Sequence, residues 1–181
     1  MPLARYLREK NYTVGLACNC EVALEAPGLP DIVKQWHGTI EECEIFHIPF
    51  PRQIRPWQDW RCLRKAYTLC RFWDPDIVSV QTAKAGFLGR LAAHLADVPI
   101  IHYECHAWPF RPGMVGRTAE GMPFSERVYL WLEHRALHWT DFINHETEFM
   151  RRLSLQYEMW PCRERWQDKD LMRERYLRTL R

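Results

Sequence analysis

Hydrophobic positions along the chain alternate between the two-residue period of strands and the wider spacing of helices. Short apolar runs predict strands over residues 13–18, 43–50, 74–80, 99–103 and 140–144. Apolar residues three and four positions apart predict helices over residues 57–73, 86–96 and 125–139, with another helix from about residue 146. Strands that alternate with helices predict an α/β fold, in which a parallel sheet is covered by helices on both faces.

The predicted strand over residues 74–80 leads into the most informative turn of the chain. Its segment "DIVSV" is nearly continuous in apolar residues, which is typical of a strand buried on both faces. Thr82, Lys84 and Gly86 follow it at the start of the next helix, and His106 follows the strand over 99–103. Ligands of open parallel sheets bind beyond the carboxyl ends of the strands, so these four residues are candidates for a binding site.

The local chemistry of "QTAKAG" supports two interpretations. The free N–H groups of a helix N-terminus, the charge of Lys84 and the small Gly86 together suit an anion. A strand-to-helix turn with a solvated lysine explains the same residues. Neither the Walker A pattern nor G-x-G-x-x-G is present to decide between the two.

Composition and charge narrow the classes of function. With 181 residues, of which 47% are hydrophobic, the chain can bury a sizeable core. A net charge of +2 is too small to indicate nucleic-acid binding, and we expect no nucleic-acid partner. The cysteines are scattered without a C-x-x-C pair, and the N-terminus lacks the apolar core of a signal peptide. We therefore expect free thiols and a cytoplasmic location, with contact to the inner membrane face left open.

The segment "HYECH" at residues 102–106 contains histidine, glutamate and cysteine, which are all residue types that can bind a metal. Alternate residues of a strand face opposite sides, so one strand alone cannot close a metal site. His134 and His138 are spaced for one helix face, but no third ligand is evident. We expect no metal.

Two further segments are charged. The stretch over residues 48–65 is basic and aromatic, and it could face an anionic substrate, a nucleic acid or a membrane surface. Packing of Trp57 and Trp60 at a helix entry explains it equally well. The end of the chain has little apolar periodicity. We assign residues 1–153 to one domain and residues 154–181 to a charged helical tail.

Several stretches, taken in order, resemble the N-terminal domain of family 4 glycosyltransferases of the bacterial capsule and exopolysaccharide type. They include "IPFPRQIRPWQDW", "PDIVSVQTAKAGFLGRLAA", "HAWPF" and "ERVYLWLEHRALHWTDFIN". The resemblance covers roughly residues 3–153. It implies one Rossmann-like half of a GT-B fold, which holds mainly the acceptor and faces a second, donor-binding domain.

The resemblance also implies an activity and roles for single residues. Such enzymes transfer a sugar from a nucleotide-sugar donor to a polysaccharide or lipid-linked acceptor, with retention of configuration and usually without a metal or other cofactor. His106 matches a histidine near the transferred sugar or its phosphate, and it is the catalytic candidate. Thr82, Lys84 and Gly86 match a loop that lines the cleft, and Arg52 of "PFPR" is placed near the acceptor.

The chain departs from the family pattern at several points. Ser79 and Gln81 stand where the family commonly has histidine, and Ala107 replaces a glycine. The family's first strand and its donor domain with the E-x7-E motif find no match. We therefore expect a half-domain that lacks its first strand and acts with a donor domain supplied elsewhere, such as a separate chain. The alternative is a non-catalytic anion-binding or interaction module.

Overall fold

A computed structural model describes residues 2–19, 44–51, 53–106, 108 and 123–161 of the chain. These residues form two compact units, Met1–Cys62 and Leu63–Arg181. Helix α4 (Pro56–Trp73) carries the chain from the first unit into the second. Residues 21–38, for which the sequence also predicts a loop with a short helix, lie outside the described residues.

The first unit contains a short parallel sheet. Helix α1 (Pro2–Glu9) ends in a turn in which Asn11 has a φ of 64°, a conformation that asparagine tolerates better than most residues. Strand β1 (Gly15–Cys18) then pairs in parallel with β2 (Glu44–His47), in a register that sets Gly15 opposite Glu44. Both strands lie where the apolar pattern predicts them.

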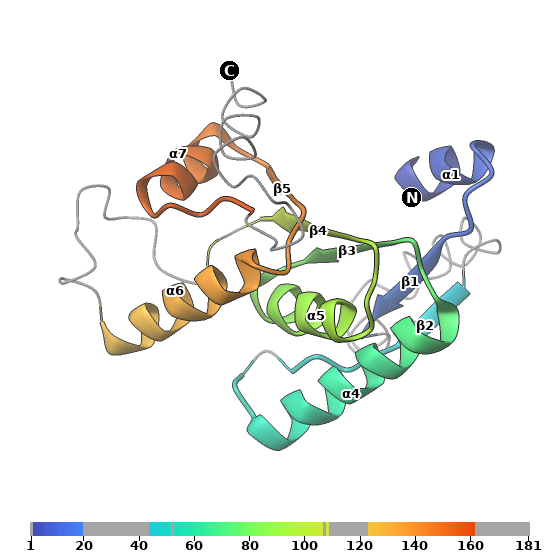
Figure 1. Cartoon of the computed structure of the whole chain (residues 1–181), viewed down its shortest axis with the longest axis horizontal. Helices are drawn as coiled ribbons and strands as arrows, with labels where there is room; N and C mark the ends of the chain where they lie inside the picture. The colour runs from blue at the N-terminus through green and yellow to red at the C-terminus, as the bar shows by residue number, and fades with distance from the viewer. Residues whose placement is uncertain (1, 20–43, 52, 107, 109–122, 162–181) are drawn as a thin grey trace, which may run out of the picture. The chain divides into compact units, whose positions relative to one another are not determined.

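The second unit is built on a three-stranded parallel sheet in the order β3-β4-β5. Helix α5 packs against β3 and β4, α6 packs against α5, and α7 contacts β5 (Figure 1). The bounds are β3 Ile77–Gln81, α5 Ala83–Leu95, β4 Ile100–Cys105, α6 Phe124–Leu137, β5 Phe142–His145 and α7 Glu148–Gln156. The prediction of an α/β fold with a parallel sheet flanked by helices is thereby confirmed.

Helix α7 (Glu148–Gln156) crosses the domain boundary that the sequence predicts between residues 153 and 154. The helix continues through positions 153 and 154, and Ser154 is buried. The assignment of residues 154–181 to a separate tail stays a prediction, because residues 162–181 lie outside the described part of the chain. Within the described residues, no helix combines the length and the apolar character needed to cross a bilayer.

The two faces of the sheet in the second unit differ in burial. Ile101, Tyr103 and Ile143 are buried toward the helices, whereas exposure alternates along β3. Ser79 and Gln81 are exposed, and Val78 and Val80 are half-buried. This differs from the expected burial of "DIVSV" on both faces, because alternate side chains of a strand point to opposite sides and only one side packs on α5.

A buried ionic network joins α5 to α6. The guanidinium group of Arg90, which has no exposed surface, donates to Glu133 at 2.5 Å and to the Gly86 carbonyl at 2.9 Å. It also lies 4.1 Å from the ring centre of Tyr103. A buried charge is tolerated only when it is paired and hydrogen-bonded, and both conditions hold here.

Glycine at position 89 is required by close packing, and this gives a first prediction. A Cβ atom on Gly89 would lie 2.6 Å from Cγ1 of Val80. We expect Gly89→Ala to destabilise the protein by about 1–2 kcal/mol, because overpacking outweighs the roughly 1 kcal/mol gained in helix propensity. Urea unfolding of Gly89→Ala, Val80→Ala and the double variant measures this.

The double variant is the control for the clash. Val80→Ala removes the atom that the new methyl group would meet, so the two changes together should cost clearly less than the sum of the single changes. Additive costs, or a Gly89→Ala protein as stable as the parent, would show that the contact with Val80 does not require glycine.

Candidate functional site

The candidate site lies at the carboxyl ends of the parallel strands in the second unit. Strands β3, β4 and β5 end at Gln81, Cys105 and His145. Because parallel neighbours end at the same edge of a sheet, the residues that follow them share that edge, as the sequence predicts for Thr82 and His106. The edge also receives Glu146, which sequence reasoning did not single out.

The predicted residues of the β3–α5 turn take different positions. Thr82 precedes α5 with a φ of 66° and a ψ of 161°, and its side chain makes no capping hydrogen bond. That conformation is normally reserved for glycine and costs a β-branched residue about 1–3 kcal/mol. Lys84 lies in the first turn of α5 and is partly exposed. Gly86 is buried, and a Cβ atom there would lie 2.7 Å from Tyr103.

Gly86 therefore has a packing role in this structure. The resemblance places it beside the substrate, but its missing side chain makes room for the Tyr103 ring of the neighbouring strand. Arg52, the residue expected near the acceptor, and Ala107 lie outside the described residues. The predicted substrate contacts of Thr82, Lys84, Gly86 and Arg52 all remain predictions.

His106 is held by a residue from the neighbouring strand end. Its Nδ1 atom forms a short hydrogen bond with a carboxylate oxygen of Glu146, and both side chains are partly exposed, at 35% and 47%. This contact fixes the imidazole through Nδ1, so Nε2 is the ring nitrogen that a ligand can meet. The arrangement places a positioned proton donor or acceptor at the sheet edge.

Polar side chains extend from this edge across the open face of the sheet. Gln81 donates to Glu104 at 2.6 Å, and Ser79 Oγ lies 2.8 Å from His102 Nδ1. Burial lowers the pKa of His102, although the charge of Glu104 and a hydrogen bond with Asn144 act in the opposite direction. We call these five residues, Ser79, Gln81, His102, Glu104 and Asn144, the polar ladder.

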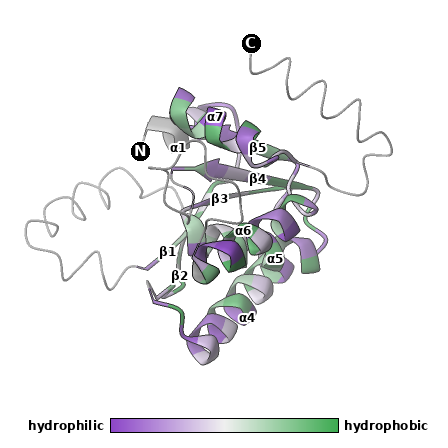
Figure 2. Ribbon diagram, turned by 90° about the vertical axis from the view of Figure 1, so that its left-hand side faces the viewer, coloured by the Kyte–Doolittle hydropathy of each residue, from purple (hydrophilic) through white to green (hydrophobic). Residues whose placement is uncertain are grey.

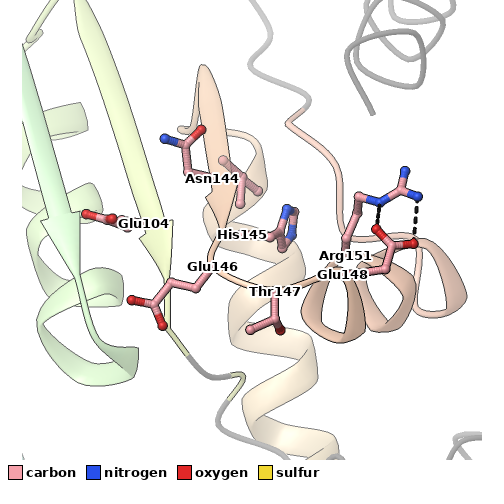
Figure 3. A pocket seen from close by; sticks show the side chains of 8 residues that line it. Glu104, Asn144, His145, Glu146, Thr147, Glu148 and Arg151 are labelled. Atoms are coloured by element: carbon pink, nitrogen blue, oxygen red, sulfur yellow. Dashed lines mark hydrogen bonds and ion pairs between the residues drawn. The ribbon is translucent and has the colours of Figure 1, made fainter. Parts of the chain in front are cut away.

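A pocket of about 450 Å³ adjoins the ladder between β4, β5 and α7. Figure 3 shows Glu104 and Glu146 on its β4 side, with Glu148 and Arg151 on its α7 side. The remaining lining residues are Ile143, Asn144, His145 and Thr147. The volume falls within the range of sites that bind small molecules.

The charges around the pocket are mainly negative. Among the lining residues that the structure describes, Arg151 is the one cation, and it donates to Glu148 at 2.6 and 2.7 Å. Hydrogen bonds from Arg151 and Arg152 lower the pKa of Glu148 to about 2, so this carboxylate stays ionised at all ordinary pH values. Glu104 and Glu146 add two more carboxyl groups. The pocket offers mostly hydrogen-bond acceptors.

The same edge contains the one described group of side chains with the spacing of a metal site. Ligand atoms of Glu104, His106 and Glu146 lie within 4.8 Å of one another. Imidazole and carboxylate are common ligands of divalent cations. The argument that one strand alone cannot close a metal site does not apply to this group. Its ligands come from two segments, since Glu104 and His106 lie at the end of β4 and Glu146 follows β5.

Sequence reasoning missed Glu146 and its neighbours because the strand before them is short. A signal was present: "NHET" follows the apolar residues of β5 directly, and the rule that selected His106 applies to it equally. Glu104 was considered only as part of a possible metal motif. Its hydrogen-bond partner Gln81 ends β3, and its neighbour Glu146 follows β5.

Comparisons with known proteins identify the family of this chain. A family model described as "Glycosyl transferase 4-like domain" matches residues 1–165. The UDP-Gal:alpha-D-GlcNAc-diphosphoundecaprenol alpha-1,3-galactosyltransferase of Escherichia coli is 31% identical over 94 residues, which are 51% of this chain and 22% of that relative. The chain therefore spans less than a quarter of the relative's length. Since the family match covers most of the chain, including the residues of the candidate site, the chain belongs to the glycosyl transferase 4-like family.

Proposed function

We propose that this chain is the acceptor-binding half of a retaining glycosyltransferase of the hexosyltransferase type. It would take part in transfer of a sugar from a nucleotide-sugar donor to a polysaccharide or lipid-linked acceptor. The observation that carries the proposal is the group formed by His106, Glu104 and Glu146 at the strand ends, beside a pocket of about 450 Å³. Family membership supplies the reaction class.

The chemistry of the pocket fits a hydroxyl-rich ligand. Carboxylates and side-chain amides accept hydrogen bonds from sugar hydroxyl groups, and charged acceptors make the stronger bonds. The pocket is lined by three glutamates and by one arginine, which already donates to one of those glutamates. This excess of negative charge disfavours the binding of an anion in the pocket. This charge balance supports sugar binding over the alternative of an anion-binding module.

His106 is the proposed catalytic residue. Held at Nδ1 by Glu146, it can present Nε2 to a sugar hydroxyl or to the departing phosphate. Glu146 acts through His106 and is a positioning residue. Thr82, Lys84, Gly86 and Arg52 are proposed to contact substrate, and Lys84 would supply the positive charge that a diphosphate on the acceptor requires.

The donor and the location complete the proposal. The E. coli relative is named for a UDP-galactose donor and a diphosphoundecaprenol-linked acceptor, so a lipid-linked diphosphate sugar is the acceptor class to test first. The nucleotide-sugar would be bound mainly by a second domain, carried on further polypeptide or on a separate chain. A lipid-linked acceptor would put the proposed reaction at the cytoplasmic face of the inner membrane.

The test is a transfer assay with His106→Ala. The full chain is joined to a donor domain of the same family, and transfer of labelled sugar to a GlcNAc-diphospho-lipid is followed. We expect His106→Ala to lower kcat/KM by at least about tenfold, because a hydrogen bond to developing charge is lost. His138→Ala, which changes a histidine at the end of α6, is the matched control and should leave transfer unchanged.

Each outcome of the transfer assay supports a different role for His106 or for the chain. If His106→Ala leaves sugar transfer unchanged, His106 takes no part in the reaction, and the family assignment still holds. A fusion that binds the glycan acceptor but transfers no sugar from any donor would favour the non-catalytic interaction module. Loss of transfer in both histidine variants would point to a general loss of structure.

A further inference from the structure

Three side chains at the carboxyl ends of β4 and β5 form a mixed set of metal ligands. Glu104 and His106 come from the end of β4, and Glu146 follows β5. Their ligand atoms lie within 4.8 Å of one another. Bonds of about 2.0–2.2 Å from one cation to nitrogen and oxygen hold neighbouring ligand atoms roughly 3–4 Å apart. Small movements of the side chains would therefore close this set around an ion.

The register of the sheet explains why these residues meet. Cys105 lies opposite His145 in the parallel pair of β4 and β5. The next residues along the two segments, His106 and Glu146, are therefore neighbours, and their side chains are hydrogen-bonded. Glu104 is two residues before His106, and residues two apart in a strand project from the same face. Figure 3 shows Glu104 and Glu146 on the opposite side of β5 from His145.

The electrostatic surroundings favour a cation at this place. Glu104 and Glu146 both line the pocket, whose charges are mainly negative, and hydrophilic residues appear in purple on β4 and β5 in Figure 2. Two carboxylates this close repel each other when both are ionised, and a bound cation would remove that repulsion. The side chains of His106 and Glu146 are 35% and 47% exposed, so an ion can enter from solution.

The types of ligand distinguish between classes of cation. Mg²⁺ and Ca²⁺ prefer oxygen ligands throughout, whereas an imidazole nitrogen beside two carboxylates raises the affinity for first-row transition metals. Three protein ligands also leave coordination positions open, as in catalytic rather than structural metal sites. Because two of the three ligands line the pocket, water or a hydroxyl group in the pocket can occupy such a position.

We propose that Glu104, His106 and Glu146 bind one divalent transition-metal ion, such as Mn²⁺ or Zn²⁺. The ion replaces the hydrogen bond between His106 and Glu146 with a bond from each side chain to the metal. This differs from the expectation of no metal, because the third ligand comes from a segment that the sequence alone does not place beside β4. The proposal stands independently of the proposed sugar transfer, since metal binding is measured on this chain alone.

The test is titration of the full chain with Mn²⁺, followed by the electron paramagnetic resonance signal of the free ion, which decreases as the ion binds. Mn²⁺ is the probe because the chain contains seven cysteines, whose soft sulfur atoms attract Zn²⁺ more than the harder Mn²⁺. We expect a single class of site, from which an about tenfold excess of Mg²⁺ displaces little Mn²⁺.

Three single variants each remove one ligand: Glu104→Gln, His106→Ala and Glu146→Gln. Each should weaken Mn²⁺ binding by at least about tenfold, because even the loss of a group that only supports a ligand costs about 10–100-fold in affinity. Glu126→Gln and His138→Ala, at the two ends of α6, are matched controls that should bind Mn²⁺ as the parent does. Circular dichroism confirms folding, and if His106→Ala unfolds, the two glutamine variants decide the question.

Three results would overturn the proposal. If the parent leaves the signal of free Mn²⁺ unchanged at millimolar concentration, the three side chains are held by hydrogen bonds alone. If His106→Ala binds Mn²⁺ as the parent does, or if Mg²⁺ displaces Mn²⁺ equally well, exposed carboxylates merely attract cations. A second measurement uses stability: Mn²⁺ should raise the unfolding temperature of the parent more than that of Glu146→Gln, because an ion that binds only the folded state stabilises it.

Discussion

Replacing Arg90 with alanine is expected to destabilise the protein by about 3–5 kcal/mol, because Glu133 would then be buried without its partner. The two side chains are 0% and 2% exposed, so water cannot replace the lost contact. The Gly86 carbonyl also loses its donor, and Tyr103 loses the guanidinium above its ring. Glu133→Ala should cost a similar amount, since it leaves the cation unpaired. Urea unfolding followed by circular dichroism measures both values.

A double variant separates the ion pair from simple loss of packing. Arg90→Met with Glu133→Leu keeps most of the volume and removes both charges. It should be more stable than either alanine variant by at least about 2 kcal/mol, because no buried charge remains unpaired. Costs below about 1 kcal/mol for the single changes would mean that water reaches the pair after all.

The second large effect is a loss of stability in acid that depends on His145. Its ring lies 2.5 Å from Ser154 Oγ through Nε2 and packs beside Trp108. Burial, with a smaller contribution from the positive charge of Arg151, lowers the pKa of His145 to about 4. In the unfolded chain the pKa returns to about 6.5, so the unfolded state binds a proton that the folded state does not.

The direction and the pH window follow from those two pKa values. Above about pH 6.5 histidine is neutral in both states and the free energy of unfolding is unaffected. As the pH falls from about 6.5 to 4, protonation stabilises only the unfolded chain, and stability should fall by up to about 3 kcal/mol. Below about pH 4 the folded state is protonated as well, and this contribution to the slope ends.

Unfolding midpoints at several pH values, compared with those of His145→Gln, test this assignment. Glutamine can still bond to Ser154 but does not titrate, so the difference between the two proteins should shrink between about pH 6.5 and 4. Glu148, whose pKa is lowered from 4.5 to about 2, destabilises the folded state as the pH falls below about 4.5, but both proteins contain it and its contribution cancels in the difference. Parallel pH profiles for parent and variant would show that another group is responsible.

The sequence predicts the elements of the second unit because each one carries a local signal. The strands at Ile77–Gln81 and Ile100–Cys105 are apolar runs, and the helix between them has its own periodicity. Family resemblance supplied the reaction class, and the family match agrees with it. Positions at the strand ends were predicted for Thr82 and His106 by a rule that needs only the direction of the strands.

What the sequence could not provide depends on contacts between distant segments. The pairing of His106 with Glu146 requires β5 to lie beside β4, which no local pattern encodes. Arg90 resembles any polar residue of a helix until Glu133 on α6 is known to reach it. Gly86 was assigned to a ligand because its contact with Tyr103 crosses from a helix to a strand.

The polar ladder has a consequence for selectivity. Its imidazole, amide, hydroxyl and carboxylate groups are tied to one another across strands, so their positions are set by the backbone spacing of about 4.8 Å between strands. Water wets such a face, and a solute gains nothing there unless it returns the hydrogen bonds that the displaced water made. A hydroxyl-rich solute would therefore be held on the polar ladder only as far as its hydroxyl groups match the spacing of the ladder.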